Sequence, residues 1–148
     1  MRVLHQVLKR IYQDYAVFYP PVDAHEIQMV NNALVQDGLA ALPQDYMNFL
    51  MMTNGLFYNG LEMFATREHE REKGAFFHRA IVQMQRFYTS NPALNGKILL
   101  AQAPEEFVLY DFKRKEYQIM DRYSYGVFLK LPNLLDVFYY YAKPTIEK

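Results

Sequence analysis

The chain has 148 residues, 51% of them hydrophobic and 22% charged, which predicts one folded domain over residues 1–148 and excludes a disordered chain. Sixteen basic residues balance sixteen acidic ones, so the chain as a whole has no net charge to attract nucleic acid or an anionic membrane. It contains no cysteine, which excludes disulfide bonds and thiol chemistry.

The first predicted element is an N-terminal helix that ends before YAVFYPPVD, where two prolines forbid its continuation. Its apolar residues repeat with helical spacing at Val3, Leu4, Val7, Leu8 and Ile11. Polar residues interrupt this start, MRVLHQVLKR, so it lacks the apolar core of a secretory signal. No stretch reaches the roughly 20 apolar residues that a membrane span needs. We therefore expect a cytoplasmic protein without membrane association.

A second helix should begin after Asp23, whose side chain suits the N-cap position. Glu26 lies three residues on, as in a capping box, and a buried stripe follows at Ile27, Val30 and Leu34. Gly38 is expected to end this helix.

The stretch LPQDYMNFLMMTNG, residues 42–55, predicts a third helix with Pro43 at its first helical position and Asp45 in its first turn. Tyr46, Phe49, Leu50 and Thr53 share one face, which must pack against another element. Asn54 and Gly55 tolerate positive φ and are expected to end the helix.

The rest of the chain predicts mainly strands. Asn59-Gly60 indicates a hairpin within LFYNGLEMFA at 56–65. REHEREK at 67–73 indicates a charged loop, and AFFHRAIVQMQRFY at 75–88 a helix through Phe77, Ala80, Ile81, Met84 and Tyr88. Strands follow at KILLAQA, EFVLYDF, EYQIMD and YGVFLKL, then a closing helix at Leu134, Leu135, Phe138 and Tyr141/Ala142. Helices followed by mainly antiparallel strands indicate an α+β domain, with the sheet packed against several helices.

The sequence contains no motif that predicts a catalytic residue, a metal site or a cofactor site. HEIQM at 25–29 lacks the second histidine of a zinc-protease helix, and His69 in EHE is better explained as part of an exposed charged loop. Ser90 and Ser124 do not lie in a Gly-x-Ser-x-Gly turn, and no phosphate-binding loop is present.

Other charged and aromatic groups have structural interpretations. Asp111 and Asp121 are expected to end strands and bond turn amides rather than to form a carboxylate pair. The Lys113-Arg114-Lys115 hairpin tip could touch nucleic acid, but a charged tip that prevents strand association explains it more simply, so no nucleic-acid partner is predicted. Tyr139, Tyr140 and Tyr141 cannot all face the core of one helix, so at least one should be exposed.

The pattern Leu-Pro-x-x-Tyr-x-x-Phe-Leu-x-x-x-Asn-Gly resembles the SUKH superfamily, which includes fungal cell-wall assembly regulators and bacterial immunity proteins of toxin systems. The residues that carry it are Pro43, Tyr46, Phe49, Leu50, Asn54 and Gly55. EFVLYDFKRKEYQIMD is similar to the family's strand–turn–strand, so the resemblance runs from about residue 24 to residue 142. The chain departs from the pattern at Asn31-Asn32 and at APEEF, 103–107. The insert at 66–92 resembles that of a YrhA-like bacterial branch.

The resemblance implies an α+β domain that binds other proteins and is not an enzyme. The leading hypothesis is an immunity protein that neutralises a cognate toxin by covering its active site, and the alternative is an intracellular regulatory or scaffold protein of the same fold. A small hydrolase is a further alternative, which requires a pocket that holds His69 or His78 with carboxylates. If the toxin is a nuclease, acidic residues would compete for its basic groove. The candidate partner-binding residues are Glu68, Glu70, Glu72, Glu105 and Glu106.

Overall fold

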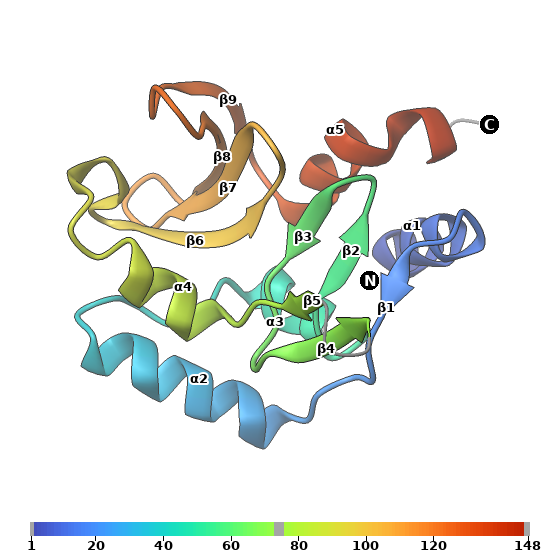
Figure 1. Cartoon of the computed structure of the whole chain (residues 1–148), viewed down its shortest axis with the longest axis horizontal. Helices are drawn as coiled ribbons and strands as arrows, with labels where there is room; N and C mark the ends of the chain where they lie inside the picture. The colour runs from blue at the N-terminus through green and yellow to red at the C-terminus, as the bar shows by residue number, and fades with distance from the viewer. Residues whose placement is uncertain (1, 73–75, 147–148) are drawn as a thin grey trace.

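The computed structural model describes residues 2–72 and 76–146, with only the backbone for 2, 70–72, 76–77 and 143–146. The fold is α+β, and the α+β prediction is confirmed (Figure 1). The described elements are α1 (Arg2–Gln13), β1 (Val17–Phe18), α2 (Ala24–Gln36), α3 (Gln44–Leu50), β2 (Leu56–Tyr58), β3 (Leu61–Met63), β4 (His69–Glu72), β5 (Phe76–His78), α4 (Ile81–Phe87), the 3₁₀ helix η1 (Pro92–Leu94), β6 (Lys97–Gln102), β7 (Glu106–Asp111), β8 (Glu116–Asp121), β9 (Val127–Leu131) and α5 (Leu134–Ile146).

In the described part of the chain, the main sheet has seven strands in the order β1-β2-β3-β6-β7-β8-β9, and every neighbouring pair is antiparallel. The predicted hairpin at 56–65 and the four predicted strands near 97–131 are confirmed. Asn59 and Gly60 both have positive φ, 50° and 81°, as the tight turn between β2 and β3 requires. β4 and β5 form a separate two-stranded hairpin.

Helix α3 lies against the sheet through its apolar face, as predicted for residues 42–55. Tyr46, Phe49 and Leu50 are 0% exposed. The Tyr46 hydroxyl donates to the carbonyls of Phe64 (2.6 Å) and Leu100 (3.1 Å), so it joins α3 to the backbone after β3 and in β6. The Phe49 ring lies 5.7 Å from that of Phe138, which places α5 beside α3.

The ends of α3 differ from the prediction. Pro43 is the N-cap and not the first helical residue, because its ψ of 146° is extended although its carbonyl accepts from the Met47 amide. The helix ends at Leu50, before Asn54-Gly55. Asn54 instead binds Thr66: its side-chain amide donates to the Thr66 hydroxyl, and its side-chain oxygen accepts from the Thr66 amide, both at 2.9 Å.

Helices α1 and α2 agree with the predictions except at one residue. In α1 the stripe Leu4, Val7, Leu8 and Ile11 is buried, whereas Val3 is 48% exposed. The α2 N-cap is confirmed, because the Asp23 carboxylate accepts from the Glu26 amide at 2.9 Å. Gly38 has a φ of 86° and ends α2 as predicted.

The segment between β3 and α4 contradicts two predictions. Residues 67–73 were expected to form a loop, and 75–88 a helix, but β4 and β5 pair through His69–His78 and Glu70–Phe77. Helix α4 cannot begin before Ile81, because backbone hydrogen bonds from Ala65 to Arg79 (3.0 Å) and from Ile81 to Ala65 (2.8 Å) hold that stretch extended. Helical spacing of apolar residues does not reveal such long-range pairing. Lys73 and Ala75, which belonged to the two predicted segments, lie outside the described residues.

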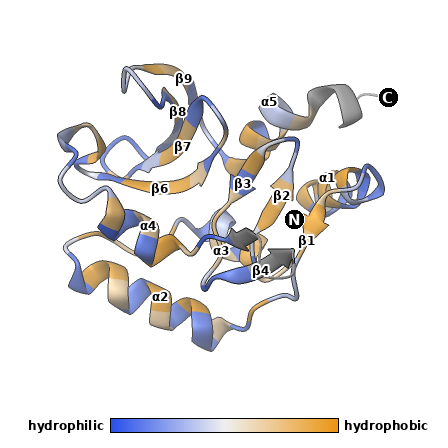
Figure 2. Cartoon of the chain, viewed as in Figure 1, coloured by the Kyte–Doolittle hydropathy of each residue, from blue (hydrophilic) through white to orange (hydrophobic). Residues whose placement is uncertain are grey.

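The closing helix is confirmed as α5, with Leu134, Phe138 and Ala142 buried. Figure 2 shows mostly apolar residues along β6 and alternating apolar and polar bands along α2, as expected for an inner strand and an outer helix. None of the helices in the described part of the chain has the length and apolar character needed to cross a bilayer.

Candidate partner-binding surface

Three turns lie together at one end of the main sheet. They join β2 to β3, β6 to β7 and β8 to β9, which are antiparallel pairs of the same sheet. A Cβ added to Gly60 would lie 3.3 Å from the Pro104 ring, so the first two turns touch. We call this region the turn surface, and it comprises Asn59, Gly60, Pro104, Glu105, Glu106, Arg122, Tyr123, Tyr125 and Tyr140.

The β8–β9 turn is bound to the β6–β7 turn by hydrogen bonds. The Arg122 amide donates to the Glu105 carbonyl at 3.0 Å, and the Arg122 guanidinium donates to the Ala103 carbonyl at 2.9 Å. The same guanidinium lies 4.9 Å from the centre of the Phe107 ring, within the range of a cation–π contact. The Tyr123 hydroxyl donates to the Pro104 carbonyl at 3.2 Å, yet Tyr123 is 75% exposed.

Helix α5 adds two tyrosines that bind one glutamate of the turn surface. The hydroxyls of Tyr140 and Tyr141 donate to the two oxygens of Glu106, at 3.1 and 2.8 Å. Burial, reinforced by the Glu106 carboxylate, raises the pKa of Tyr141 far above its ordinary value, so the phenol keeps its proton. Tyr140 is 41% exposed, which confirms that at least one of Tyr139, Tyr140 and Tyr141 reaches the surface.

The five candidate glutamates do not form one surface. Glu105 is exposed on the turn surface, and Glu106 beside it is held by α5. Glu68 is exposed before β4, and β4 approaches Asn54, whose carbonyl accepts from the His69 ring at 3.1 Å. Asn54 precedes β2, at the end opposite the Asn59-Gly60 turn. The backbones of Glu70 and Glu72 lie in β4, and their side chains lie outside the described residues.

The predicted turn roles of Asp111 and Asp121 are confirmed. Asp111 accepts from the amides of Lys113 and Arg114, both at 3.0 Å, and Asp121 accepts from those of Tyr123 and Ser124, at 2.8 and 2.9 Å. Asp111 pairs with Glu116 near the β7–β8 tip and Asp121 with Glu106 at the far end, so the two carboxylates are well separated. Asp121 thereby shapes the turn that presents Tyr123.

A charged cluster around the buried carboxylate of Glu62 lies between β3, β5 and β6, with the exposed Arg79 at its edge, and the sequence patterns did not indicate it. Glu62, 4% exposed, accepts from the Arg79 amide (2.8 Å), the Arg79 guanidinium (3.0 Å) and the Gln102 side chain (2.9 Å). His78, 0% exposed, lies 4.0 Å from Glu62 and donates to the Met63 carbonyl.

The ionised state of Glu62 is favoured inside this cluster. Burial alone raises the pKa of Glu62, but the hydrogen bonds from Gln102 and the Arg79 amide, with attraction to His78 and Arg79, outweigh burial and lower the pKa below its ordinary value. The charged carboxylate of Glu62 thereby connects β3 to β6 and to the residue after β5.

The histidine of the EHE motif also has structural contacts. The His69 ring stacks on Tyr19, with ring centres 4.3 Å apart, and burial lowers the pKa of His69. No group of three histidine, aspartate or glutamate side chains able to hold a metal ion is found among the residues that the structure describes.

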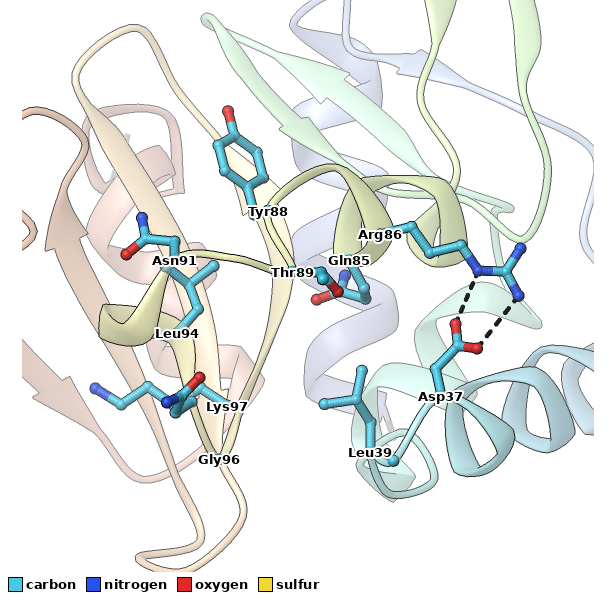
Figure 3. A pocket seen from close by; sticks show the side chains of 12 residues that line it. Asp37, Leu39, Gln85, Arg86, Tyr88, Thr89, Asn91, Leu94, Gly96 and Lys97 are labelled. Carbon is cyan, nitrogen blue, oxygen red and sulfur yellow. Dashed lines mark hydrogen bonds and ion pairs between the residues drawn. The ribbon is translucent and has the colours of Figure 1, made fainter.

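A polar cleft of about 260 Å³ opens between the end of α2, α4 and the start of β6 (Figure 3). Arg86 reaches from α4 to Asp37 and donates to both carboxylate oxygens, at 2.8 and 3.4 Å. Gln85 is buried beside Arg86. Its side-chain amide donates to the Leu99 carbonyl, and its side-chain oxygen accepts from the Leu99 amide at 2.8 Å. Leu99 lies in β6 before the residues that pair with β3. Arg86 is thus bonded to Asp37, and Gln85 to Leu99. These contacts connect α4 to α2 and to the sheet, so the polar groups of the cleft already have structural partners.

Sequence reasoning proposed Glu105 and Glu106 but missed Arg122 and Tyr123. The available signal was Tyr123 in the short connection at 122–124 between the predicted strands EYQIMD and YGVFLKL, because such connections lie on the surface. No family model matches the chain, and a search of curated proteins finds no match to it.

Proposed function

We propose that this chain is a SUKH-like protein-binding module, acting in the cytoplasm as an immunity protein that neutralises a cognate bacterial toxin by direct binding through the turn surface. The observation that carries the proposal is that exposed Tyr123 and Glu105 lie on hydrogen-bonded turns, while exposed Tyr140 reaches Glu106 from α5. The motif residues Tyr46 and Asn54, by contrast, are buried and hold the fold. The scaffold and the proposed contact surface thus use different residues.

Tyrosines on rigid turns suit a binding surface for two physical reasons. A tyrosine side chain offers a large apolar ring with a polar tip, and such residues are enriched among those that dominate binding energies. The turns are already braced through Arg122 and Tyr123, so little conformational entropy is lost when a partner binds.

The charge of the turn surface favours a basic partner. The turn surface contains two carboxylates, Glu105 and Glu106, and one guanidinium, Arg122, so its net charge is negative. A nuclease or another toxin with a basic active-site groove would meet an acidic and aromatic face, which speeds association and blocks the groove.

The test is a binding measurement with the toxin domain encoded beside this chain's gene. Tyr123→Ala should weaken the affinity about tenfold or more, since loss of a central aromatic contact costs about 1.4 kcal/mol or more. Glu105→Lys should lower the association rate and make it less sensitive to salt. When each variant is co-expressed with the toxin in cells, Tyr123→Ala and Glu105→Lys should protect the cells less well than the unmodified chain.

Matched variants at other places provide the controls. Tyr15→Ala removes a tyrosine that is 92% exposed outside the turn surface, and Glu68→Lys reverses an exposed charge before β4. Both should keep the affinity within about twofold of the unmodified chain. Loss of binding with the controls but not with the turn-surface variants would remove the turn surface from the interface.

Gene order separates immunity from the regulatory or scaffold alternative. A toxin gene directly upstream supports immunity, and an isolated locus together with no binding to any neighbouring product supports regulation. A hydrolase screen tests the remaining alternative, because turnover that Glu62→Gln abolishes would show the buried cluster to be catalytic.

A further inference from the structure

A second surface, separate from the turn surface, lies between α1 and the edge of the sheet. It is an apolar groove of about 480 Å³ lined by His5, Leu8, Lys9, Tyr12, Phe18 and Met52. We call it the α1 groove. It lies beside β1, which pairs with β2 and is one of the two edge strands of the main sheet.

The groove has an apolar floor and an exposed aromatic wall. Leu8 is buried, and Phe18 and Met52 are half-buried. Tyr12 is 61% exposed, and its ring lies 5.2 Å from that of Phe18. Covering such exposed apolar surface with a partner is favourable, because it removes that surface from water.

Lys9 is the formally charged residue among the side chains that line the α1 groove. His5 and Lys9 are exposed and lie one helical turn apart. Helix α1, RVLHQVLKRIYQ, contains no acidic residue, and none of the groove's lining residues is acidic. Asp14, just beyond α1, accepts from the Tyr58 hydroxyl at 2.6 Å. A partner segment would therefore need apolar side chains flanked by carboxylates.

The spacing along α1 favours a helix as the occupant. His5, Lys9 and Tyr12 stand at i, i+4 and i+7, so they line about 10 Å, or two turns, of α1. A second helix lying along α1 presents its own side chains with the same period.

We propose that the α1 groove binds an acidic amphipathic helix of a partner protein. Apolar side chains of that helix enter between Tyr12, Phe18 and Met52, and its carboxylates face Lys9. The proposal is independent of the proposed function, because none of the residues lining the groove belongs to the turn surface.

A synthetic helix tests the proposal directly. The probe is a hydrocarbon-stapled peptide of about 14 residues with leucine at i, i+4 and i+7, flanked by glutamates. Its twin carries lysine in place of every glutamate. Fluorescence anisotropy should show saturable binding of the acidic peptide with a Kd of about 100 µM or tighter, and binding of the lysine twin at least about tenfold weaker.

Variants of the full chain locate the binding. Tyr12→Ala and Lys9→Glu should each weaken the acidic peptide about fivefold or more. Tyr15→Ala and Lys113→Glu, matched changes outside the groove, should leave the Kd unchanged. Amide chemical shifts that change on peptide addition should lie in α1, β1 and near Met52.

Each other outcome overturns the proposal. No saturation at about 1 mM peptide, or equal binding of the lysine twin, removes the acidic helix as the occupant. Unchanged affinity in both groove variants removes the location. A concentration-dependent dimer in sedimentation that Tyr12→Ala abolishes assigns the groove to a second copy of this chain instead.

Discussion

Gly55 and Gly38 have similar backbone conformations in very different surroundings. Their φ angles are 93° and 86°, a region that favours glycine. A Cβ at Gly55 would lie 2.7 Å from Nε2 of buried His78 and 3.0 Å from the Cβ of Ala65, whereas a Cβ at Gly38 would meet nothing within 4 Å. The glycine of the Asn-Gly pair is thus required by the close approach of β5 as well as by its dihedral angle.

This difference predicts unequal costs for the same substitution. Gly38→Ala should lower the free energy of unfolding by about 1–2 kcal/mol, the cost of a left-handed conformation. Gly55→Ala should cost about 1–3 kcal/mol more, because His78 is packed and must shift. Urea unfolding of the two variants measures both values, and equal losses would show that His78 yields to the added methyl group without strain.

Between elements, the buried Glu62 connects three parts of the sheet region. It sits in β3, accepts from Gln102 in β6, and accepts from Arg79 directly after β5. Among the described residues, β4 and β5 pair with each other and with no strand of the main sheet, so this cluster and the Ala65–Ala80 bridge help to hold the hairpin in place. The Glu62 carboxylate thus links these strands through side-chain hydrogen bonds in addition to the backbone hydrogen bonds of the sheet.

The cluster makes stability depend on pH in a defined direction. The pKa of Glu62 is lower in the folded chain than its ordinary value of 4.5, so the unfolded chain binds the proton more readily. The stabilisation is complete above about pH 4.5 and is lost as the pH falls through the lower folded pKa. Glu62→Gln should therefore flatten the fall in unfolding free energy below about pH 4.5. Urea titrations at several pH values measure the slope, and an unchanged slope would contradict the role of Glu62.

At the scale of the whole molecule, one hydrophobic core extends from the first helix to the last. Its buried residues run from Leu4 in α1 to Ala142 in α5, and the Glu62–Gln102 pairing joins the two halves of the sheet. The core therefore contains residues from both halves of the chain. Such a core predicts cooperative unfolding as one unit.

The expected single domain can be tested by comparing two probes of unfolding. The chain has 13 tyrosines and no tryptophan, so tyrosine fluorescence reports tertiary packing while far-UV circular dichroism reports helices and strands. Both should give the same midpoint and slope in urea. Two separate transitions would divide the chain into independently folding parts.

Local patterns were sufficient for most elements. The capped α2, the Asn59-Gly60 hairpin, strands β6 to β9 and helix α5 were predicted because neighbouring residues specify each of them through periodicity, capping or turn chemistry. Prediction was wrong for β4, β5 and the first part of the helix expected at 75–88, where pairing with distant backbone overrides local spacing. The two-residue strand β1 was missed for the same reason, since its partner β2 lies almost 40 residues further along.

The candidate surfaces depended on contacts that no single segment contains. Residues 42–55 already indicated a helix with one buried face, and Glu105 and Glu106 were already candidates, because these inferences need only a period or a charge. The position of Arg122 over Phe107, the binding of Tyr140 to Glu106 and the α1 groove beside Phe18 arise when strands and helices far apart in the chain pack together. Packing in three dimensions determines which side chains remain exposed, and exposure determines what this protein can bind.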